Sequence, residues 1–269
     1  MFEVTRNLNI CQACASALVL STVTLFAQTV STDVGRTKTA ATSPSTSRSP
    51  AKSEVKAVSV FFKGARILFQ GDSITDGNRG RNADPNHILG HGYVFVIGAK
   101  YAAAFPEQNL TFLNRGVSGN TALDLANRWQ QDTLDLKPDI LSILIGVNDS
   151  HRGVTLGQYE TAYDKLLADA RAANPNLRLV LCAPFCLPVG KQKEGYEAWS
   201  ADIKQRQEIV AKLAQKYHAA LVCLQPVFDR ACKRAPADYW IWDGVHPTYS
   251  GHQLMVDEWI RTVREFWPK

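Results

Sequence analysis

A doubly wound α/β domain, with a parallel sheet covered by helices on both faces, is the fold class that the sequence predicts. From residue 65 to the C-terminus, short apolar runs alternate with longer amphipathic segments. The short runs are apolar on both faces, as the strands of a buried parallel sheet are. Polar motifs follow several of these runs directly, and in such sheets ligands bind at the carboxyl ends of the strands.

Five strands and five long helices follow from the pattern. We expect the strands at 66–70, 110–114, 139–145, 178–183 and 220–224. We expect the helices at 92–105, 121–131, 157–173, 196–217 and 249–266. The third helix is typical: Tyr163, Leu166 and Ala170 recur at helical spacing, and Asn174-Pro175 ends it.

The overall composition is that of an ordinary globular protein. The chain has 269 residues, of which 45% are hydrophobic and 20% are charged, and its net charge is +5. No predicted element concentrates Lys and Arg, so we expect no nucleic-acid partner.

The first 55 residues differ from the rest of the chain. Residues 1–27 contain the apolar run from Ile10 to Ala27 and resemble an export signal; a membrane anchor is the alternative, because the run approaches the length of a spanning helix. Residues 28–55 are rich in Ser, Thr and Pro, which predicts a disordered linker. We therefore expect an extracytoplasmic protein, periplasmic or secreted, whose folded domain covers 56–269. Contact with a membrane is expected only if the N-terminal segment is retained.

Four of the six cysteines lie in the predicted domain. Cys182 and Cys223 fall in strand-like runs, where buried thiols are expected. Cys186 and Cys232 are the first pair to test for a disulfide, which an extracytoplasmic compartment permits. The cysteines and histidines lack the spacing of a zinc site, so we expect no metal and no cofactor.

The tripeptide Gly71-Asp72-Ser73 directly follows the first predicted strand. A serine where a buried strand ends and a helix begins is well placed to be a nucleophile, because the unpaired N–H groups of a helix start favour an anionic oxygen. Alone, the tripeptide is equally typical of an ordinary helix cap. The other polar motifs at the strand ends favour the nucleophile.

A base and its orienting group lie near the C-terminus, in the segment WDGVHP at 242–247. His246 can take the proton of Ser73 and return it, since imidazole titrates near neutrality. Asp243 can bond the other ring nitrogen if the segment turns, as its Gly and Pro allow. The alternative, a turn-capping aspartate beside a surface histidine, is weakened by the strand-end serine. We expect Ser73, Asp243 and His246 to be the catalytic residues.

Donors for an oxyanion are expected after the second and third strands. Gly119 allows a substrate to approach its backbone N–H, and Asn148 offers a side-chain amide. The backbone N–H of Ser73 would be the third donor. The structural alternatives are a tight turn at Gly119 and an Asn-Asp turn at Asn148, whose neighbour Asp149 is expected to anchor its loop.

Four blocks in this chain resemble the four sequence blocks of the SGNH (GDSL-type) hydrolases, in the same order. They are Gly71-Asp72-Ser73, Gly119, Gly146-Val147-Asn148-Asp149 and Asp243-Gly244-Val245-His246. The resemblance covers residue 65 to the C-terminus. It implies a flavodoxin-like three-layer α/β/α sandwich with a five-stranded parallel sheet, a Ser-His-Asp triad, and an oxyanion hole from Ser73, Gly119 and Asn148. No G-x-S-x-G motif surrounds Ser73, unlike in the α/β-hydrolases.

Within that superfamily, the flanking segments look most like the carbohydrate acetylesterases. The matching segments are GDSITD (71–76), GHGYV (90–94), NRGVSGNTALDLANRW (114–129), KPD (137–139), IGVND (145–149) and WDGVHPTYSGH (242–252). The resemblance implies a metal-free serine esterase that removes acetyl groups from acetylated xylan or xylo-oligosaccharides. The alternatives are a lysophospholipase, a thioesterase or a general carboxylesterase with the same triad. A non-catalytic carbohydrate- or partner-binding protein is the alternative of another class, and a homo-oligomer is compatible with each.

Further residues near the motifs have two interpretations each. Arg115 and Arg128 are candidates for contacts with sugar hydroxyls, although paired arginines are commoner. Trp242 is a candidate wall of the acyl pocket, with a core tryptophan as the alternative. His252, on the last predicted helix, is expected to make a structural hydrogen bond rather than replace His246. Additional aromatic surface is expected from Tyr239, Trp240 and Tyr249.

Overall fold

The structure, a computed structural model, describes residues 59–268. The predicted export signal at 1–27 and the predicted linker at 28–55 lie outside the described residues.

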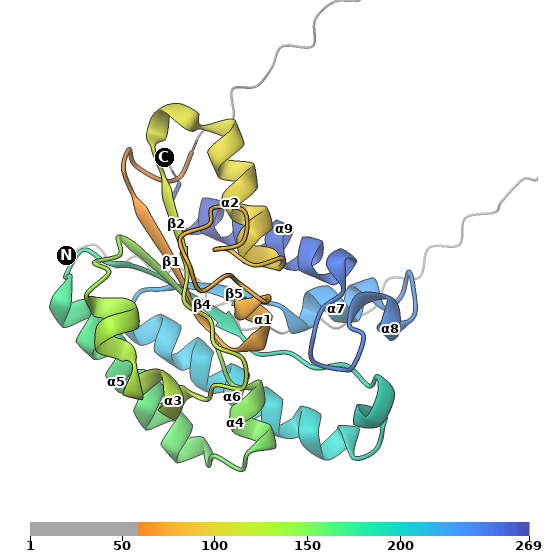
Figure 1. The fold of residues 1–269 in the computed structure, drawn as a ribbon. Helices are drawn as coiled ribbons and strands as arrows, with labels where there is room; N and C mark the ends of the chain where they lie inside the picture. Colours follow the sequence, from red (N-terminus) through yellow and green to blue (C-terminus); the bar gives the residue numbers. More distant parts are fainter. Residues whose placement is uncertain (1–58, 269) are drawn as a thin grey trace, which may run out of the picture. The chain divides into compact units, whose positions relative to one another are not determined.

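Five parallel strands form one sheet (Figure 1). They are β1 (Arg66–Gly71), β2 (Thr111–Asn114), β3 (Ile140–Leu144), β4 (Arg178–Ala183) and β5 (Ala220–Cys223). Their order in the sheet is β2-β1-β3-β4-β5, the flavodoxin-like arrangement of a doubly wound fold. The predicted five-stranded parallel sheet is confirmed, and every strand begins and ends within one residue of its predicted range.

Helices cover both faces of the sheet, as the pattern predicted (Figure 1). On one face lie α2 (Tyr93–Ala104) and α9 (Tyr249–Phe266); on the other lie α3 (Ala122–Asn127), α5 (Leu156–Ala173) and α6 (Tyr196–Lys216). Successive strand side chains point to opposite faces of the sheet. Ile67 and Phe69 pack toward α2 and α9, whereas Leu68 between them packs toward α3 and α5. The strands are therefore apolar on both sides, which is why they read as continuous apolar runs.

The helix predicted at 121–131 is shorter than expected. It ends at Asn127, and a separate π-helical turn follows at Gln130–Leu134. The amide of Gln70, at the end of β1, donates a hydrogen bond of 2.8 Å to the carbonyl oxygen of Asp132. The turn is widened because the N–H of Asp135 donates to the carbonyl oxygen of Gln130 five residues earlier (2.9 Å).

Short helices escaped the sequence pattern, because one or two turns do not establish a period. They are α1 (Ser73–Asp76), α4 (Val147–His151), α7 (Gln225–Ala231) and α8 (Ala237–Trp240), with 3₁₀ turns at Pro106–Gln108 and Gly190–Lys193. Two of them carry predicted site residues: α1 follows β1 and α4 follows β3, so both start at the same edge of the sheet.

Cys182 is a buried thiol in β4, as predicted. The burial expected for Cys223 was wrong: this residue is only half-buried, because β5 is an edge strand of the sheet. Cys186 and Cys232 also carry free thiols, so the disulfide considered between them is not formed here. Between residues 59 and 268, no helix has the length and apolar character needed to span a membrane. In the same range, no group of His, Cys, Asp and Glu side chains is arranged to hold a metal ion.

Candidate active site

Ser73 is the first residue of α1 and follows the carboxyl end of β1 after a tight turn. Gly71 adopts φ 156°, and a Cβ at this position would overlap the carbonyl oxygen of Leu144 in β3 and the hydroxyl of Thr75. The carboxylate of Asp72 accepts a hydrogen bond of 3.0 Å from the backbone N–H of Ile74 and so caps α1. Glycine and aspartate thus set the turn that presents the serine.

The segment that carries Asp243 and His246 does turn, as the prediction required. Oδ1 of Asp243 accepts hydrogen bonds from the backbone N–H of Val245 (3.0 Å) and of His246 (2.7 Å). The loop is closed where the N–H of Trp242 donates to the carbonyl of His246 (3.1 Å). Gly244 has φ 93°, a conformation that suits glycine at the apex of this turn.

The three predicted catalytic side chains form one hydrogen-bonded row. Oγ of Ser73 lies 2.7 Å from Nε2 of His246, and Nδ1 of His246 lies 2.7 Å from Oδ2 of Asp243. Burial opposes ionisation of Asp243, but the hydrogen bonds from His246 and Val245 outweigh it and lower the pKa of this carboxyl. An ionised Asp243 fixes the ring so that Nε2 faces the serine hydroxyl.

Besides Ser73, two oxyanion donors were predicted, Gly119 and Asn148. The loop that carries Gly119 is hydrogen-bonded to α4, which carries Asn148. Gly119 is exposed with φ 81°, and a Cβ there would meet no atom within 4 Å. Nδ2 of Asn148, on α4, donates to the carbonyl oxygen of Asn120 (3.1 Å). An amide nitrogen carries two hydrogens, so Asn148 keeps a second donor for a substrate oxygen.

Asp149 anchors its loop, as expected. It is fully buried, and Oδ1 accepts a hydrogen bond of 2.9 Å from the backbone N–H of Ala122 at the start of α3. Burial raises the pKa of Asp149 to about 6 and that of Asp72 to about 7. Asp72 and Asp149, two buried carboxyl groups next to the site residues Ser73 and Asn148, therefore lose their protons only at a higher pH than an ordinary carboxyl group does.

Sequence reasoning missed Asp76, which joins α1 to the loop that carries Gly119. Its buried carboxylate accepts hydrogen bonds from the backbone N–H (3.1 Å) and the hydroxyl (3.0 Å) of Ser118 and two from Arg81 (2.9 and 2.8 Å). Burial opposes its ionisation, but these bonds lower the pKa of Asp76. The only signal was its place within GDSITD, three residues after Ser73 on the same short turn.

Arg128 is paired within the protein, in agreement with the commoner interpretation. Its guanidinium donates to Oδ1 of Asn120 (2.7 Å), to the carbonyl of Arg115 (2.8 Å) and to the carbonyl of Gly71 (3.3 Å). It also contacts Asp132 at 3.1 Å. Arg128 therefore clamps the loop after β2 onto the end of β1, beneath the site.

The aromatic residues around the triad divide into exposed and buried ones. Trp242 is 65% exposed and stacks near the ring of His246, with 6.4 Å between ring centroids, so it is not a core tryptophan. Tyr239 and Tyr249 are exposed as well. The expectation for Trp240 was wrong: it is buried, and Nε1 donates to the carbonyl of Ala235 (3.2 Å), because α8 turns this face inward.

His252 has the structural role that was predicted. Nδ1 of this histidine accepts a hydrogen bond of 3.2 Å from the backbone N–H of Tyr93, the first residue of α2. Burial lowers the pKa of His252 to about 4, so the ring stays neutral at physiological pH. It caps a helix and does not replace His246.

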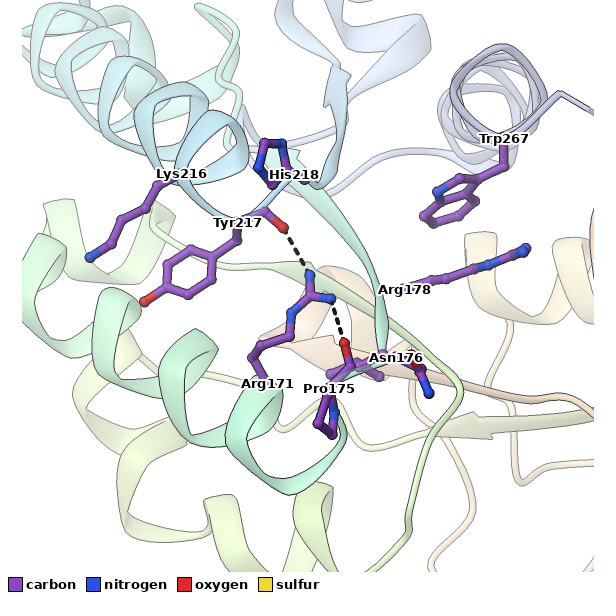
Figure 2. A pocket seen from close by; sticks show the side chains of 9 residues that line it. Arg171, Pro175, Asn176, Arg178, Lys216, Tyr217, His218 and Trp267 are labelled. Carbon is purple, nitrogen blue, oxygen red and sulfur yellow. Dashed lines mark hydrogen bonds between the residues drawn. The ribbon is translucent and has the colours of Figure 1, made fainter.

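A hollow of about 540 Å³ lies at the opposite edge of the sheet, before β4 and β5 (Figure 2). Figure 2 shows Arg171 held there by the carbonyl oxygens of Pro175 (3.2 Å) and Tyr217 (2.8 Å). Arg178 and Trp267 form another part of its wall. None of the residues that line it belongs to the row formed by Ser73, His246 and Asp243, so the candidate active site is the carboxyl edge of the sheet.

Known proteins are similar to this chain in sequence and fold. The model of the GDSL-like lipase/acylhydrolase family matches residues 69–254. An acetylxylan esterase from Geobacillus stearothermophilus is 30% identical over 216 residues, which cover 76% of this chain and 96% of that protein. The crystal structure of this esterase, Axe2, superposes with a TM-score of 0.67 at 30% identity, over 75% of this chain and 95% of that one.

Further solved structures are similar as well. A GDSL-like protein from Parabacteroides merdae has a TM-score of 0.72 at 37% identity, covering 76% of this chain and 98% of that one. Structures of Axe2 described as catalytic mutants replace an aspartate, a serine and a histidine in turn, and the aspartate and histidine are three residues apart. This chain belongs to the GDSL-like lipase/acylhydrolase family, the SGNH hydrolases, and is a carboxylic ester hydrolase.

Proposed function

We propose that this esterase removes acetyl groups from carbohydrate, such as acetylated xylan or xylo-oligosaccharides, with Ser73 as nucleophile. The observation that carries the proposal is the continuous row from the hydroxyl of Ser73 through the ring of His246 to Asp243, with 2.7 Å at each step. A serine, a base and an oriented carboxylate in this geometry are the requirements for acyl transfer.

The chemistry follows from the direction of these bonds. Nε2 of His246 takes the hydroxyl proton as Oγ of Ser73 attacks the ester carbonyl carbon. The backbone N–H groups of Ser73 and Gly119 and the amide of Asn148 stabilise the oxyanion. His246 then gives the proton to the departing sugar oxygen, and a water molecule, activated by the same ring, releases acetate from Ser73.

The substrate class rests on two supports. The chain is similar to an acetylxylan esterase over nearly the whole length of that enzyme. In addition, Trp242 offers an exposed aromatic face beside His246, and Tyr239 and Tyr249 expose further rings on nearby elements. Flat apolar faces of this kind suit the stacking of sugar rings better than the enclosure of a long acyl chain.

Two measurements test the proposal. Ser73→Ala removes the nucleophile, and we expect it to abolish hydrolysis of 4-nitrophenyl acetate while the circular dichroism spectrum is unchanged. Acetate release from acetylated xylan is then compared with hydrolysis of esters of increasing acyl length. A preference for acyl chains of about eight carbons or more would identify a lysophospholipase, thioesterase or general carboxylesterase instead.

We also propose that residues 1–27 direct export, so that the enzyme meets its polymeric substrate outside the cytoplasm. The apolar run from Ile10 to Ala27 supports this proposal. N-terminal sequencing of the mature protein tests it: a new N-terminus near residue 28 is expected, and an intact N-terminus on cytoplasmic protein would contradict export.

A further inference from the structure

Arg206, on α6, is a buried cation that lies behind the candidate active site. Only 2% of it is exposed. Nη2 donates to the carbonyl oxygen of Val154 (2.7 Å), Nε bonds Oδ2 of Asp202 (2.8 Å), and the guanidinium lies 5.1 Å above the ring of Tyr159. A fully buried arginine is costly to desolvate, so it has to be compensated by contacts such as these.

The contacts of Arg206 lead directly to α4. The N–H of Val154, whose carbonyl Arg206 binds, donates to the backbone carbonyl of Asp149 (2.9 Å). Asp149 is the neighbour of Asn148 on α4, and Oδ1 of Asp149 holds the N–H of Ala122 at the start of α3. One arginine on α6 thus reaches, through Val154, the element that carries the oxyanion donor.

The positive charge of Arg206 also acts on Asp149. Burial raises the pKa of Asp149, and the positive charge of Arg206 counteracts this shift. Two polar atoms of this pair, Oδ2 of Asp149 and Nη1 of Arg206, are buried. Neither has a hydrogen-bond partner among the described residues. Asp149 also interacts electrostatically with Asp124 on α3, with Asp72 after β1, and with Tyr159 and Tyr163 on α5. Arg206 is the one cation in this set.

We propose that Arg206 is a positioning residue for the oxyanion hole, which holds α4 and the amide of Asn148 in place through the carbonyl of Val154 and the charge of Asp149. The inference rests on the role of Asn148 in the proposed function. A donor that moves by a fraction of an ångström no longer matches the developing oxyanion, so the loss falls on the chemical step rather than on substrate binding.

The test uses Arg206→Met and Arg206→Lys, with Arg171→Met as the matched control. Arg171 is likewise bonded to backbone carbonyls, but at the opposite edge of the sheet. For Arg206→Met we expect kcat for 4-nitrophenyl acetate to fall at least tenfold with KM changed less than twofold. Protonation of Asp149 removes the charge proposed to hold α4, so the part of the acid limb of the kcat profile that follows Asp149 should move to higher pH when the cation is lost. Arg171→Met should leave kcat and the pH profile unchanged, whatever its effect on Tm.

A second comparison separates the charge from the hydrogen bond. Arg206→Lys keeps the positive charge but lacks the fork that reaches Val154, so we expect a lower kcat with an acid limb at the wild-type pH. This variant decides the matter if Arg206→Met does not fold. Combining Arg206→Met with Asp149→Asn should abolish the pH shift, since the titrating group is gone.

The outcomes distinguish this inference from the proposed function. If Ser73→Ala and Asn148→Ala lose activity but both Arg206 variants keep wild-type kcat and pH profile, the positioning role is overturned and the proposed function stands. If Ser73→Ala retains activity, the proposed function itself fails.

Discussion

The hydroxyl of Ser73 lies 2.7 Å from Nε2 of His246, although 173 residues separate the two in the chain. Ser73 lies in the turn after β1, the strand next to the edge strand β2. His246 lies in a loop just before the last helix, α9. On its far side, the imidazole is held by Asp243, which also fixes the backbone of the same loop through Oδ1. The orientation of the ring therefore depends on one aspartate.

Replacing that aspartate tests the orientation of the ring. In Asp243→Asn, an amide replaces the carboxylate that accepts from Nδ1, so the ring is held in the wrong tautomer and its cationic form loses its partner. We expect kcat for 4-nitrophenyl acetate to fall by about 10⁴-fold, the loss seen for the same change in a serine protease triad, with little change in KM. Asp238→Asn, at an exposed site on α8, is the control and should behave as wild type.

The oxyanion role of Asn148 makes a separate prediction. Asn148→Ala removes the side-chain amide, one hydrogen of which bonds the carbonyl of Asn120 (3.1 Å) while the other is left for the substrate oxygen. Because the bond to that oxygen strengthens when charge develops on it, kcat should fall about 10²–10³-fold while KM changes little. Steady-state kinetics on 4-nitrophenyl acetate measure this split. Asn176→Ala, an exposed position at the opposite edge of the sheet, serves as control. A kcat within twofold of wild type for Asn148→Ala would remove this residue from the oxyanion hole.

The buried carboxyl of Asp72 predicts a dependence of stability on pH. Burial raises the pKa of Asp72 to about 7 from its ordinary value of 3.8. Between these values the unfolded chain has lost the proton and the folded protein keeps it, so this group makes the folded state less stable as pH rises, until the folded protein also ionises near pH 7. The free energy of unfolding lost in this way is up to about 4 kcal/mol.

Asp72→Asn should remove that dependence. The amide oxygen can still accept from the N–H of Ile74, so the cap on α1 is kept. In urea unfolding from pH 4 to pH 8, we expect the variant to gain stability relative to wild type as pH rises. A constant difference between the two proteins across this range would show that Asp72 does not titrate within it.

Two glycine substitutions should have opposite effects. In Gly116→Ala the added Cβ would overlap the backbone nitrogen of Asp76 and lie 2.8 Å from its Cα, so we expect a loss of about 1–3 kcal/mol in unfolding free energy. In Gly157→Ala, within α5, the Cβ meets no atom within 4 Å, and we expect a gain of about 0.5 kcal/mol. Thermal unfolding of the pair checks the signs; equal effects would contradict the close approach at Gly116.

The strands and the residue types of the site could be predicted from local patterns. A buried parallel strand is an uninterrupted apolar run, as Ile67 to Phe69 illustrates, and the turn that follows it must lie at the carboxyl edge. Ser73 and Asn148 each follow closely after such a strand in the chain, whereas His246 lies in the loop just before the last helix. Their convergence could be inferred because the topology of the sheet brings these edges together.

Contacts between distant segments could not be predicted in this way. The sequence pattern continues from 121 to 131, yet the helix ends at Asn127 and a π-helical turn follows, whose Asp132 carbonyl accepts a hydrogen bond from Gln70 in the sheet. Trp240 and Trp242 differ by two positions and look alike in the sequence, yet one is buried and the other is 65% exposed. The face that a short helix buries depends on its packing against elements that lie far away in the chain.

By itself, the sequence determined the doubly wound fold and the order of its elements, and it predicted the serine, histidine and aspartate of the candidate site, because periodicity and short motifs are local properties. Only the tertiary structure decided the 2.7 Å contact between Ser73 and His246, the inward carboxylate of Asp76 and the buried guanidinium of Arg206 behind α4. These contacts depend on how side chains from separate helices and strands pack together in the interior, where each buried polar group needs a hydrogen-bond partner or a compensating charge.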